Sequence, residues 1–210
     1  MLLYRSILEE AEAEQTINRS RFITHVSPAE TYEEAQAYVA LIRETFRDAT
    51  HNVPAVIIGA GQELKWASDD GEPQGTSGPP MLKLLSDEGL TNLVVVVTRY
   101  FGGVKLGTGG LVRAYTSSAR LGLEAAGICE VRDCLTLNCT VEYPALSKIQ
   151  NKSREGLYKI GDIAYTDKVA LELSFEPEHE ARVLSLLNDL TAGSCLVSDR
   201  KSGKIKTKIG

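Results

Sequence analysis

A glycine-rich stretch carries most of the chemistry that this sequence offers. Residues 99–115 read RYFGGVKLGTGGLVRAY, with five glycines between an apolar run and a helical pattern. Glycine permits positive φ angles and lets backbone N–H groups approach a ligand closely. A helix N-terminus adds free N–H donors and a partial positive charge. Together these features favour an anion, most naturally a phosphate. The residues expected to bind it are Arg99, Gly102, Gly103, Lys105, Gly107, Thr108, Gly109, Gly110 and Arg113.

The alternative for these glycines is structural, namely tight turning and close packing of a helix on a sheet. The stretch is not a Walker A loop, because Thr108 follows Gly107 where that motif requires lysine. The G-x-G-x-x-G spacing of a dinucleotide-binding turn is also absent. The nearer analogy is the glycine-rich helix start of the sugar and mevalonate kinases, and it concerns fold and loop only.

A second polar segment, residues 69–78, reads DDGEPQGTSG and places three carboxylates beside hydroxyls and glycines. Asp69, Asp70 and Glu72 could hold Mg²⁺ or act as general acid and base. They could equally cap the following helix or pair with the basic residues of the glycine-rich stretch. Pairing is the simpler account, since no histidine or second acidic cluster stands at ligand spacing. We therefore predict no metal site and no cofactor.

His51 and Asn52 form a polar pair directly before a hydrophobic strand. A neutral histidine can donate to a base or a phosphate, or serve as a proton shuttle. The alternative is a structural histidine whose hydrogen bonds are satisfied. No Ser–His–Asp or Cys–His set follows from the spacing, so no catalytic residue is assigned. The residues expected to support the anion site are His51, Asn52, Asp69, Asp70, Glu72 and Thr76.

The net charge of −5 argues against a dedicated duplex-DNA binder. The charges are segregated, however, because no carboxylate lies between Glu88 and Glu124, whereas four basic residues do. The stretch from Arg200 onward adds four lysines and is either a second basic surface or a solvated terminus. Two basic regions on an acidic protein indicate local anionic partners.

The four cysteines form no C-x-x-C pair, so neither a zinc ribbon nor a thioredoxin motif is predicted. Small buried side chains in a reducing compartment account for them. The longest strongly apolar run, 93–97, is far shorter than the roughly 20 residues that span a bilayer. The first 15 residues turn acidic where a signal peptide would be apolar. We therefore expect a cytoplasmic protein without a membrane partner.

The sequence pattern of the N-terminal half predicts alternating strands and helices. Its clearest element is a helix after Thr31, because Thr31 and Glu34 can form a capping box and apolar residues recur at spacings of three and four through Phe46. Residues 92–98 are a largely β-branched run, typical of a strand buried on both faces. The other predicted elements are strands at 16–26, 53–58 and 63–67, and helices beginning at Pro79 and at about Leu111.

The pattern restarts after Cys134. The predicted elements are a strand at 135–142, a helix at 144–154, strands at 158–165 and 169–175, a helix from Pro177 and a strand at 194–198. The order β-α-β-β-α-β is the ferredoxin-like plan. We therefore predict an α+β protein with an N-terminal domain at 1–134 and a ferredoxin-like C-terminal domain at 135–210.

Three motifs together resemble the signature of the YigZ/IMPACT family. They are DATHN at 48–52, DDGEPQGTSGPP at 69–80 and VVVVTRYFGGVKLGTGGLVRAY at 94–115. The resemblance covers roughly residues 16–130, and the pattern at 135–210 is similar to the C-terminal domain of bacterial members. It implies an N-terminal domain with the fold of the second domain of a small-subunit ribosomal protein, as in domain IV of elongation factor G. It implies a C-terminal domain like domain V of that factor.

Both of those relatives meet RNA on the ribosome, so the resemblance implies RNA or ribosome binding in the regulation of translation. Eukaryotic members restrain a stress-response kinase largely through an additional N-terminal domain, for which we expect no room before residue 16. Our leading hypothesis is a translation-associated protein that binds RNA or the ribosome and is not an enzyme. The alternatives are an enzyme or binding protein for a small phosphorylated ligand, and a protein-interaction adaptor whose partner is unknown.

Overall fold

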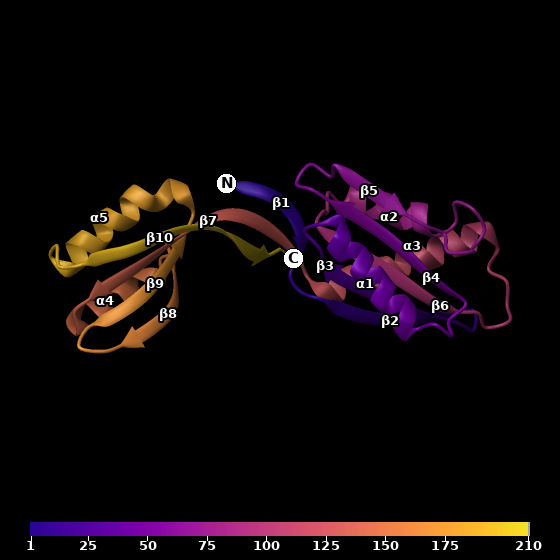
Figure 1. Ribbon diagram of the computed structural model, residues 1–210, viewed down its shortest axis with the longest axis horizontal. Coiled ribbons are helices and arrows are strands. Elements are labelled where there is room, and N and C mark those ends of the chain that lie inside the picture. The colour runs from indigo at the N-terminus through magenta and orange to yellow at the C-terminus, as the bar shows by residue number, and fades with distance from the viewer. Residues whose placement is uncertain (210) are drawn as a thin grey trace. The chain divides into compact units, whose positions relative to one another are not determined.

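The computed structural model describes residues 1–209, and Figure 1 shows its elements. These residues divide into two compact units, which we describe separately. The first unit contains residues 3–131 and 206–209, and the second contains residues 1–2 and 132–205. The division at Val131 lies three residues before the predicted boundary after residue 134, and both chain ends group differently from that prediction. The domain limits 1–134 and 135–210 stay a prediction.

The first unit is built on a five-stranded sheet in which every neighbouring pair is antiparallel. Its strands, in spatial order, are β2 (Ala11–Ile17), β3 (Ser20–Pro28), β6 (Leu93–Tyr100), β4 (His51–Ile58) and β5 (Leu64–Ala67). The helices are α1 (Tyr32–Thr45), α2 (Gly78–Asp87) and α3 (Gly107–Ala126). Helix α1 covers one face of the sheet, while α2 and α3 cover the other (Figure 1).

The central strand β6 contributes to a core on each face. Val95 and Val97 pack with residues of α2 and α3, whereas Val94 and Val96 pack with residues of α1. All four valines are fully buried. Because side chains alternate along a strand, a strand covered by helices on both sides needs apolar residues at every position. The predicted double burial of this strand is confirmed.

Helix α1 begins as its capping residues predict. The Thr31 Oγ1 accepts a hydrogen bond from the Glu34 N–H at 3.2 Å, and the Glu34 carboxylate accepts one from the Glu30 N–H at 2.8 Å. The second bond reaches one residue further back than a standard capping box. Ala35, Val39 and Ile42 then face the core, as their spacing requires.

Two predictions in this half need correction. The predicted strand 16–26 is a hairpin, because the chain turns at Asn18 and Arg19, whose φ angles are +46° and +68°. Positive φ at two successive residues matches the type I′ turn that joins antiparallel strands. Helix α3 begins at Gly107 rather than near Leu111, so three of the loop glycines lie in its first turn.

The second unit follows the βαββαβ order. Its elements are β7 (Ile128–Val141), α4 (Tyr143–Ser153), β8 (Lys159–Tyr165), β9 (Val169–Phe175), α5 (Glu180–Thr191) and β10 (Leu196–Lys208), with a 3₁₀ turn at Pro177–His179 before α5. The strands lie in the order β10-β7-β9-β8. Strand β1 (Leu2–Ile7), which belongs almost entirely to the first unit, pairs with β7, whose residues 128–131 also belong to the first unit. This order and connectivity are ferredoxin-like, and the α+β class is confirmed.

The core of the second unit lies between its sheet and its two helices. Leu137, Leu173, Val183 and Leu187 are buried there within one cluster. The predicted last strand, 194–198, is too short, since β10 continues to Lys208. The lysines after Arg200 therefore lie on a largely exposed strand and not on a frayed end. Within residues 1–209, no helix is long and apolar enough to cross a membrane.

Candidate functional site

The strand register assembles the centre of the site at the end of β6. Phe22 of β3 and His51 of β4 both lie directly opposite Arg99 of β6. Residues opposite one another on neighbouring strands project to the same face of a sheet. Phe22 belongs to the core under α2 and α3, so Arg99 is directed beneath these helices and is only 4% exposed.

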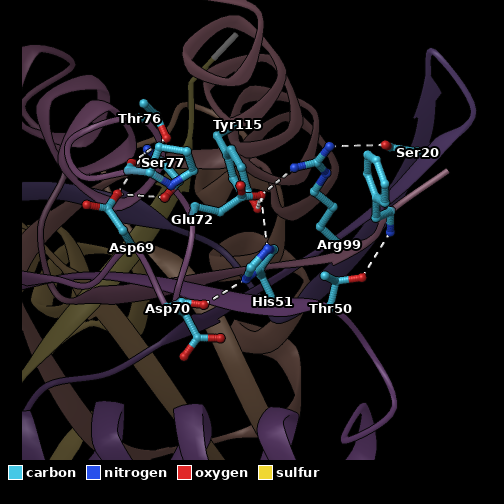
Figure 2. A network of polar contacts seen from close by, with 12 residues as sticks. Ser20, Thr50, His51, Asp69, Asp70, Glu72, Thr76, Ser77, Arg99 and Tyr115 are labelled. Atoms are coloured by element: carbon cyan, nitrogen blue, oxygen red, sulfur yellow. Dashed lines mark hydrogen bonds and ion pairs between the residues drawn. The ribbon is translucent and has the colours of Figure 1, made fainter. Parts of the chain in front are cut away.

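Glu72 compensates this buried guanidinium. Its Oε1 accepts hydrogen bonds from Arg99 Nη1 at 2.6 Å and from the Tyr115 hydroxyl at 2.7 Å (Figure 2). A carboxylate can remain buried and charged only when it is paired and hydrogen-bonded. Burial and the hydrogen bond to Glu72 raise the pKa of Tyr115 above its usual value, so its hydroxyl stays a donor. The pairing between the acidic segment and the basic stretch, which the sequence favoured, is present here.

Arg99 is fixed on its other sides as well. Its Nη2 donates to Ser20 Oγ at 3.2 Å, and its guanidinium lies 5.4 Å from the Phe22 ring centre and 5.5 Å from that of Phe101. Stacking of this kind suits the flat, delocalised guanidinium. Arg99 is therefore held in place on several sides, and Glu72 already offsets its charge.

His51 is oriented by the loop that contains the acidic residues. Its Nδ1 lies 2.8 Å from the Asp70 carbonyl oxygen, which can only accept, so Nδ1 carries a proton. In the neutral ring the lone pair then sits on Nε2, which is 3.8 Å from Glu72 Oε1 (Figure 2). His51 thus links the loop to the buried pair.

Asp69 caps the start of α2. Its carboxylate accepts hydrogen bonds from the N–H groups of Gly75, Ser77 and Gly78 and from the Ser77 hydroxyl, over 2.6–3.0 Å. Burial acts to raise the pKa of Asp69, but these hydrogen bonds outweigh it and hold that pKa below its usual value. A carboxylate whose lone pairs are used in this way has little capacity left for a ligand.

Asp70, Asn52 and Thr76 also have structural partners. Asp70 accepts from Arg43 Nη2 at 2.8 Å and from the Asn52 N–H at 2.7 Å. The Asn52 amide donates to the Phe46 carbonyl and accepts from the Thr98 hydroxyl. The Thr76 hydroxyl donates to the Pro73 carbonyl at 2.6 Å. Across residues 1–209 no three acidic, histidine or cysteine side chains are grouped to hold a metal ion.

The start of α3 has the opposite character, because no side chain among residues 1–209 caps it. Its first turn contains no acidic residue and receives no side-chain hydrogen bond. Its N–H groups are therefore unpaired donors at the positive end of the helix dipole. Lys105 and Arg113 are exposed beside it, and neither side chain has a hydrogen bond or ion pair to any described residue. The start of α3 is therefore the part of the site with the most unpaired cations and the most unpaired N–H donors.

Two glycines before α3 are required by the backbone. A Cβ on Gly102 would lie 1.9 Å from the Arg19 carbonyl oxygen, so the loop can pass the β2–β3 turn only without a side chain. Gly103 adopts a φ of +82°, in the left-handed region that favours glycine. The structural interpretation therefore accounts for these two positions. By contrast, a Cβ on Gly109 would meet only Arg113 Nη1, at 3.7 Å.

A pocket of about 370 Å³ opens between this helix start and the buried pair. Its lining includes Glu72, Arg99, Phe101, Lys105, Leu106 and Thr108. Among the described residues, every hydrogen bond and ion pair of the Glu72 side chain involves Oε1, and none involves Oε2. The pocket thus has an acceptor and a compensated charge at its floor, the Phe101 ring on its wall and the exposed Lys105 at its rim.

The structure brings part of the predicted set together. Arg99, Lys105, Gly107, Thr108 and Glu72 line one pocket, and His51 contacts its floor. Four other predicted side chains form hydrogen bonds within helix caps, turns and strand ends instead. They are Asn52, Asp69, Asp70 and Thr76. Ser20, Phe101 and Tyr115 also contact Arg99 or Glu72, although the predicted set does not include them. Phe101 and Tyr115 lie within the glycine-rich stretch and are among its few aromatic residues, whereas no sequence signal points to Ser20. The assignment of these residues to a ligand stays a prediction.

Comparison with known proteins gives matches along most of the chain. The family model described as the Impact N-terminal domain matches residues 18–123, and that of a domain of unknown function, DUF1949, matches residues 139–194. The chain is similar to the IMPACT family member YvyE of Bacillus subtilis, with 39% identity over 96% of this chain and 92% of that protein. It is also similar to the IMPACT family member YigZ of Escherichia coli, with 34% identity over 86% of this chain and 89% of that protein.

A solved structure shows the same similarity in three dimensions. It is a crystal structure described as that of a hypothetical protein, with a TM-score of 0.60 and 32% identity over 94% of this chain and 97% of that one. Protein IMPACT of Mus musculus is 34% identical over 97 residues, which are 44% of this chain and 30% of that protein. The similarity to bacterial relatives therefore extends over both units, while that to the mouse protein covers less than half of the chain.

Proposed function

The chain belongs to the IMPACT family, and on that premise we propose that it regulates translation in the cytoplasm by binding RNA or the ribosome through the start of α3. The observation that carries the proposal is the bare helix start flanked by Lys105 and Arg113. A backbone phosphate can accept from unpaired N–H groups and attract both cations at once. The acidic residues that could repel RNA here are instead tied up in caps and ion pairs.

The proposal makes a definite statement about salt. Binding that releases counterions weakens linearly in a plot of log K against log salt concentration, with a slope of about −0.7 per phosphate contact on single strands. Removing Lys105 and Arg113 should therefore weaken binding and make that slope shallower by roughly 1.4. Arg99 is a poor choice for this test, because it is buried against Glu72 and its loss would perturb the fold.

The experiment measures binding of purified protein to ribosomes and to short RNAs over a salt series. The test variant is Lys105→Ala/Arg113→Ala, and the matched control is Lys65→Ala/Lys83→Ala, which removes two exposed lysines on β5 and α2. Salt-sensitive binding that the test variant loses and the control retains would support the proposal. Binding that is absent in every condition, or insensitive to salt, would refute it.

The second candidate function is binding of a small phosphorylated ligand, and the pocket of about 370 Å³ favours it. Pockets for small molecules commonly have volumes of roughly 300–1,000 Å³. A thermal-shift panel of phosphorylated metabolites, with and without Mg²⁺, tests this function, because a ligand at 100 times its Kd adds about 2.7 kcal/mol of stability. No stabilisation by any compound would argue against it.

A further inference from the structure

We propose that the pocket beside the start of α3 binds one unpaired ribonucleotide of single-stranded RNA, with its base on Phe101, a sugar hydroxyl at Glu72 and its phosphate on the helix start. This inference rests on the proposed function and specifies which part of an RNA the site recognises. It follows from one feature of the pocket's wall, one of its floor and one of its rim.

The wall offers one rigid aromatic surface. Phe101 is 47% exposed and lines the pocket, and the guanidinium of Arg99 lies 5.5 Å from its ring centre. The Phe101 N–H donates to Thr50 Oγ1 at 3.0 Å, which fixes the backbone at this residue. An exposed ring held in this way is a stacking platform for a base, at little cost in side-chain entropy.

The neighbouring aromatic residues cannot extend this surface. Tyr115 is fully buried, and its hydroxyl is committed to Glu72. The Tyr100 hydroxyl donates to Asp48 at 2.9 Å, while Arg21 lies over its ring. One base can therefore stack in the pocket, in contrast to the several bases that larger single-strand binding surfaces accommodate.

The floor of the pocket contains a hydrogen-bond acceptor, Glu72 Oε2, to which no described residue donates. The Glu72 side chain is only 3% exposed and lines the pocket, yet its Oε2 has no partner among the described residues. Arg99 offsets the charge of this carboxylate, so Glu72 can accept from a hydroxyl without attracting a cation strongly. A phosphate would be repelled at this position. The ribose 2′-hydroxyl is a donor that RNA has and DNA lacks.

The rim supplies the positive charge. The pocket edge is formed by Lys105, Gly107 and Thr108. Arg113 lies further along the same helix, in its second turn. The arrangement sets a polarity for the ligand, with phosphate outward and sugar and base inward. A paired base in a duplex is not available for stacking on a side chain, and duplex RNA is recognised mainly by shape. The pocket therefore selects an unpaired nucleotide.

The experiment measures binding of one labelled sequence as single-stranded RNA, single-stranded DNA and duplex RNA, by fluorescence anisotropy at fixed salt. Phe101→Leu should lower the affinity for single-stranded RNA roughly tenfold, as expected for loss of one base stack. Phe101→Tyr should bind like the unchanged protein, because it keeps the ring. Both variants should keep the salt slope, since neither changes a charge. The unchanged protein should prefer single-stranded RNA to the other two ligands.

The outcomes separate this inference from the proposed function. Unchanged affinity in Phe101→Leu, or equal affinity for RNA and DNA, would overturn the nucleotide pocket. If the Lys105→Ala/Arg113→Ala variant still lost salt-sensitive binding in that case, the proposed function would stand. Failure of the unchanged protein to bind any RNA would refute both. Stabilisation by free AMP without RNA binding would overturn the assignment to RNA and favour a small-ligand protein. Circular dichroism should be measured for each variant to check that it is folded.

Discussion

Arg99 and Glu72 form a buried ion pair, with Nη1 and Oε1 2.6 Å apart and both side chains at most 5% exposed. Truncating one partner of such a pair leaves the other charge buried without compensation. We therefore expect Glu72→Ala to lower the free energy of unfolding of the first unit by about 3–5 kcal/mol. Urea unfolding followed by the fluorescence of Trp66, the single tryptophan, measures this change.

A conservative variant separates the charge from the hydrogen bond. Tyr115→Phe removes one hydroxyl but leaves the ion pair intact, so its cost should be only about 0.5–1.5 kcal/mol. Glu124→Ala, which removes an exposed carboxylate from α3, serves as the control. A loss below about 1 kcal/mol in Glu72→Ala would contradict the view that this pair holds the loop, β6 and α3 together.

The cap on α2 predicts a stability change in acid. Asp69 has a folded-state pKa below its usual value of 3.8, so its carboxylate stabilises the fold fully once the pH is well above 3.8. That contribution is lost as the pH falls through the folded-state pKa. Asp69→Ala should therefore cost about 1 kcal/mol at pH 6, and the difference from the unchanged protein should shrink below pH 4. Urea titrations between pH 3 and 6 provide the measurement, and a difference that does not vary with pH would contradict this account.

Two loop glycines should respond oppositely to alanine. Gly102→Ala would press a methyl group against the Arg19 carbonyl, which is backbone and cannot rotate away, so we expect a loss of roughly 1–3 kcal/mol. The methyl group added by Gly109→Ala would meet only the Arg113 side chain, at an ordinary contact distance of 3.7 Å, so this variant should gain up to about 1 kcal/mol from helix propensity. Thermal unfolding of both variants gives the comparison.

The same Gly109→Ala variant tests why glycine is present there. If a phosphate approaches the backbone, the added methyl group should weaken RNA binding while the protein becomes more stable. Unchanged RNA binding would show that this glycine serves no ligand. The affinity measurement on this variant therefore distinguishes close approach of a ligand from a purely structural role.

Cysteine reactivity provides a prediction for the second unit. A hydrogen bond with Cys139 lowers the pKa of Cys195, whereas that bond and burial raise the pKa of Cys139, and burial raises the pKa of Cys129. A lower pKa gives more thiolate at a given pH, and Cys195 is also the least buried of the four. We expect iodoacetamide to modify Cys195 first, as followed by peptide mass spectrometry between pH 6 and 9. Cys139→Ala should slow this reaction, and earlier modification of Cys129 would contradict the prediction.

Local patterns were sufficient for much of the fold. The helix after Thr31 and the strand through Val95 were predicted because capping and burial are encoded within a few neighbouring residues. The hairpin at Asn18 was missed because two strands of similar composition are joined by two residues without glycine. The start of α3 was placed too late because glycine has a low helix propensity, whereas in the structure the helix already includes Gly107, Gly109 and Gly110.

The site was less accessible to sequence reasoning. The glycines and cations of its rim are contiguous, so their clustering could be read directly. Its floor joins Arg99 to Glu72, 27 positions away, and to Ser20, 79 positions away. Those contacts depend on how β3, β4 and β6 align, and strand register is a long-range property that a local pattern does not specify. The same register explains why Asn52 faces Thr98 and not the pocket.

The contrast between the two helix starts has a consequence for exchange of amide protons with solvent. At α2, the amides of Gly75, Ser77 and Gly78 share the Asp69 carboxylate, so deuterium uptake at all three should be slow and should accelerate together when that carboxylate moves. At α3, the amides of residues 107–109 have no acceptor in the helix and should exchange almost as fast as in an unfolded peptide. Any anion that occupies this start would slow those amides first, which makes them a native reporter of occupancy that requires no substitution or label.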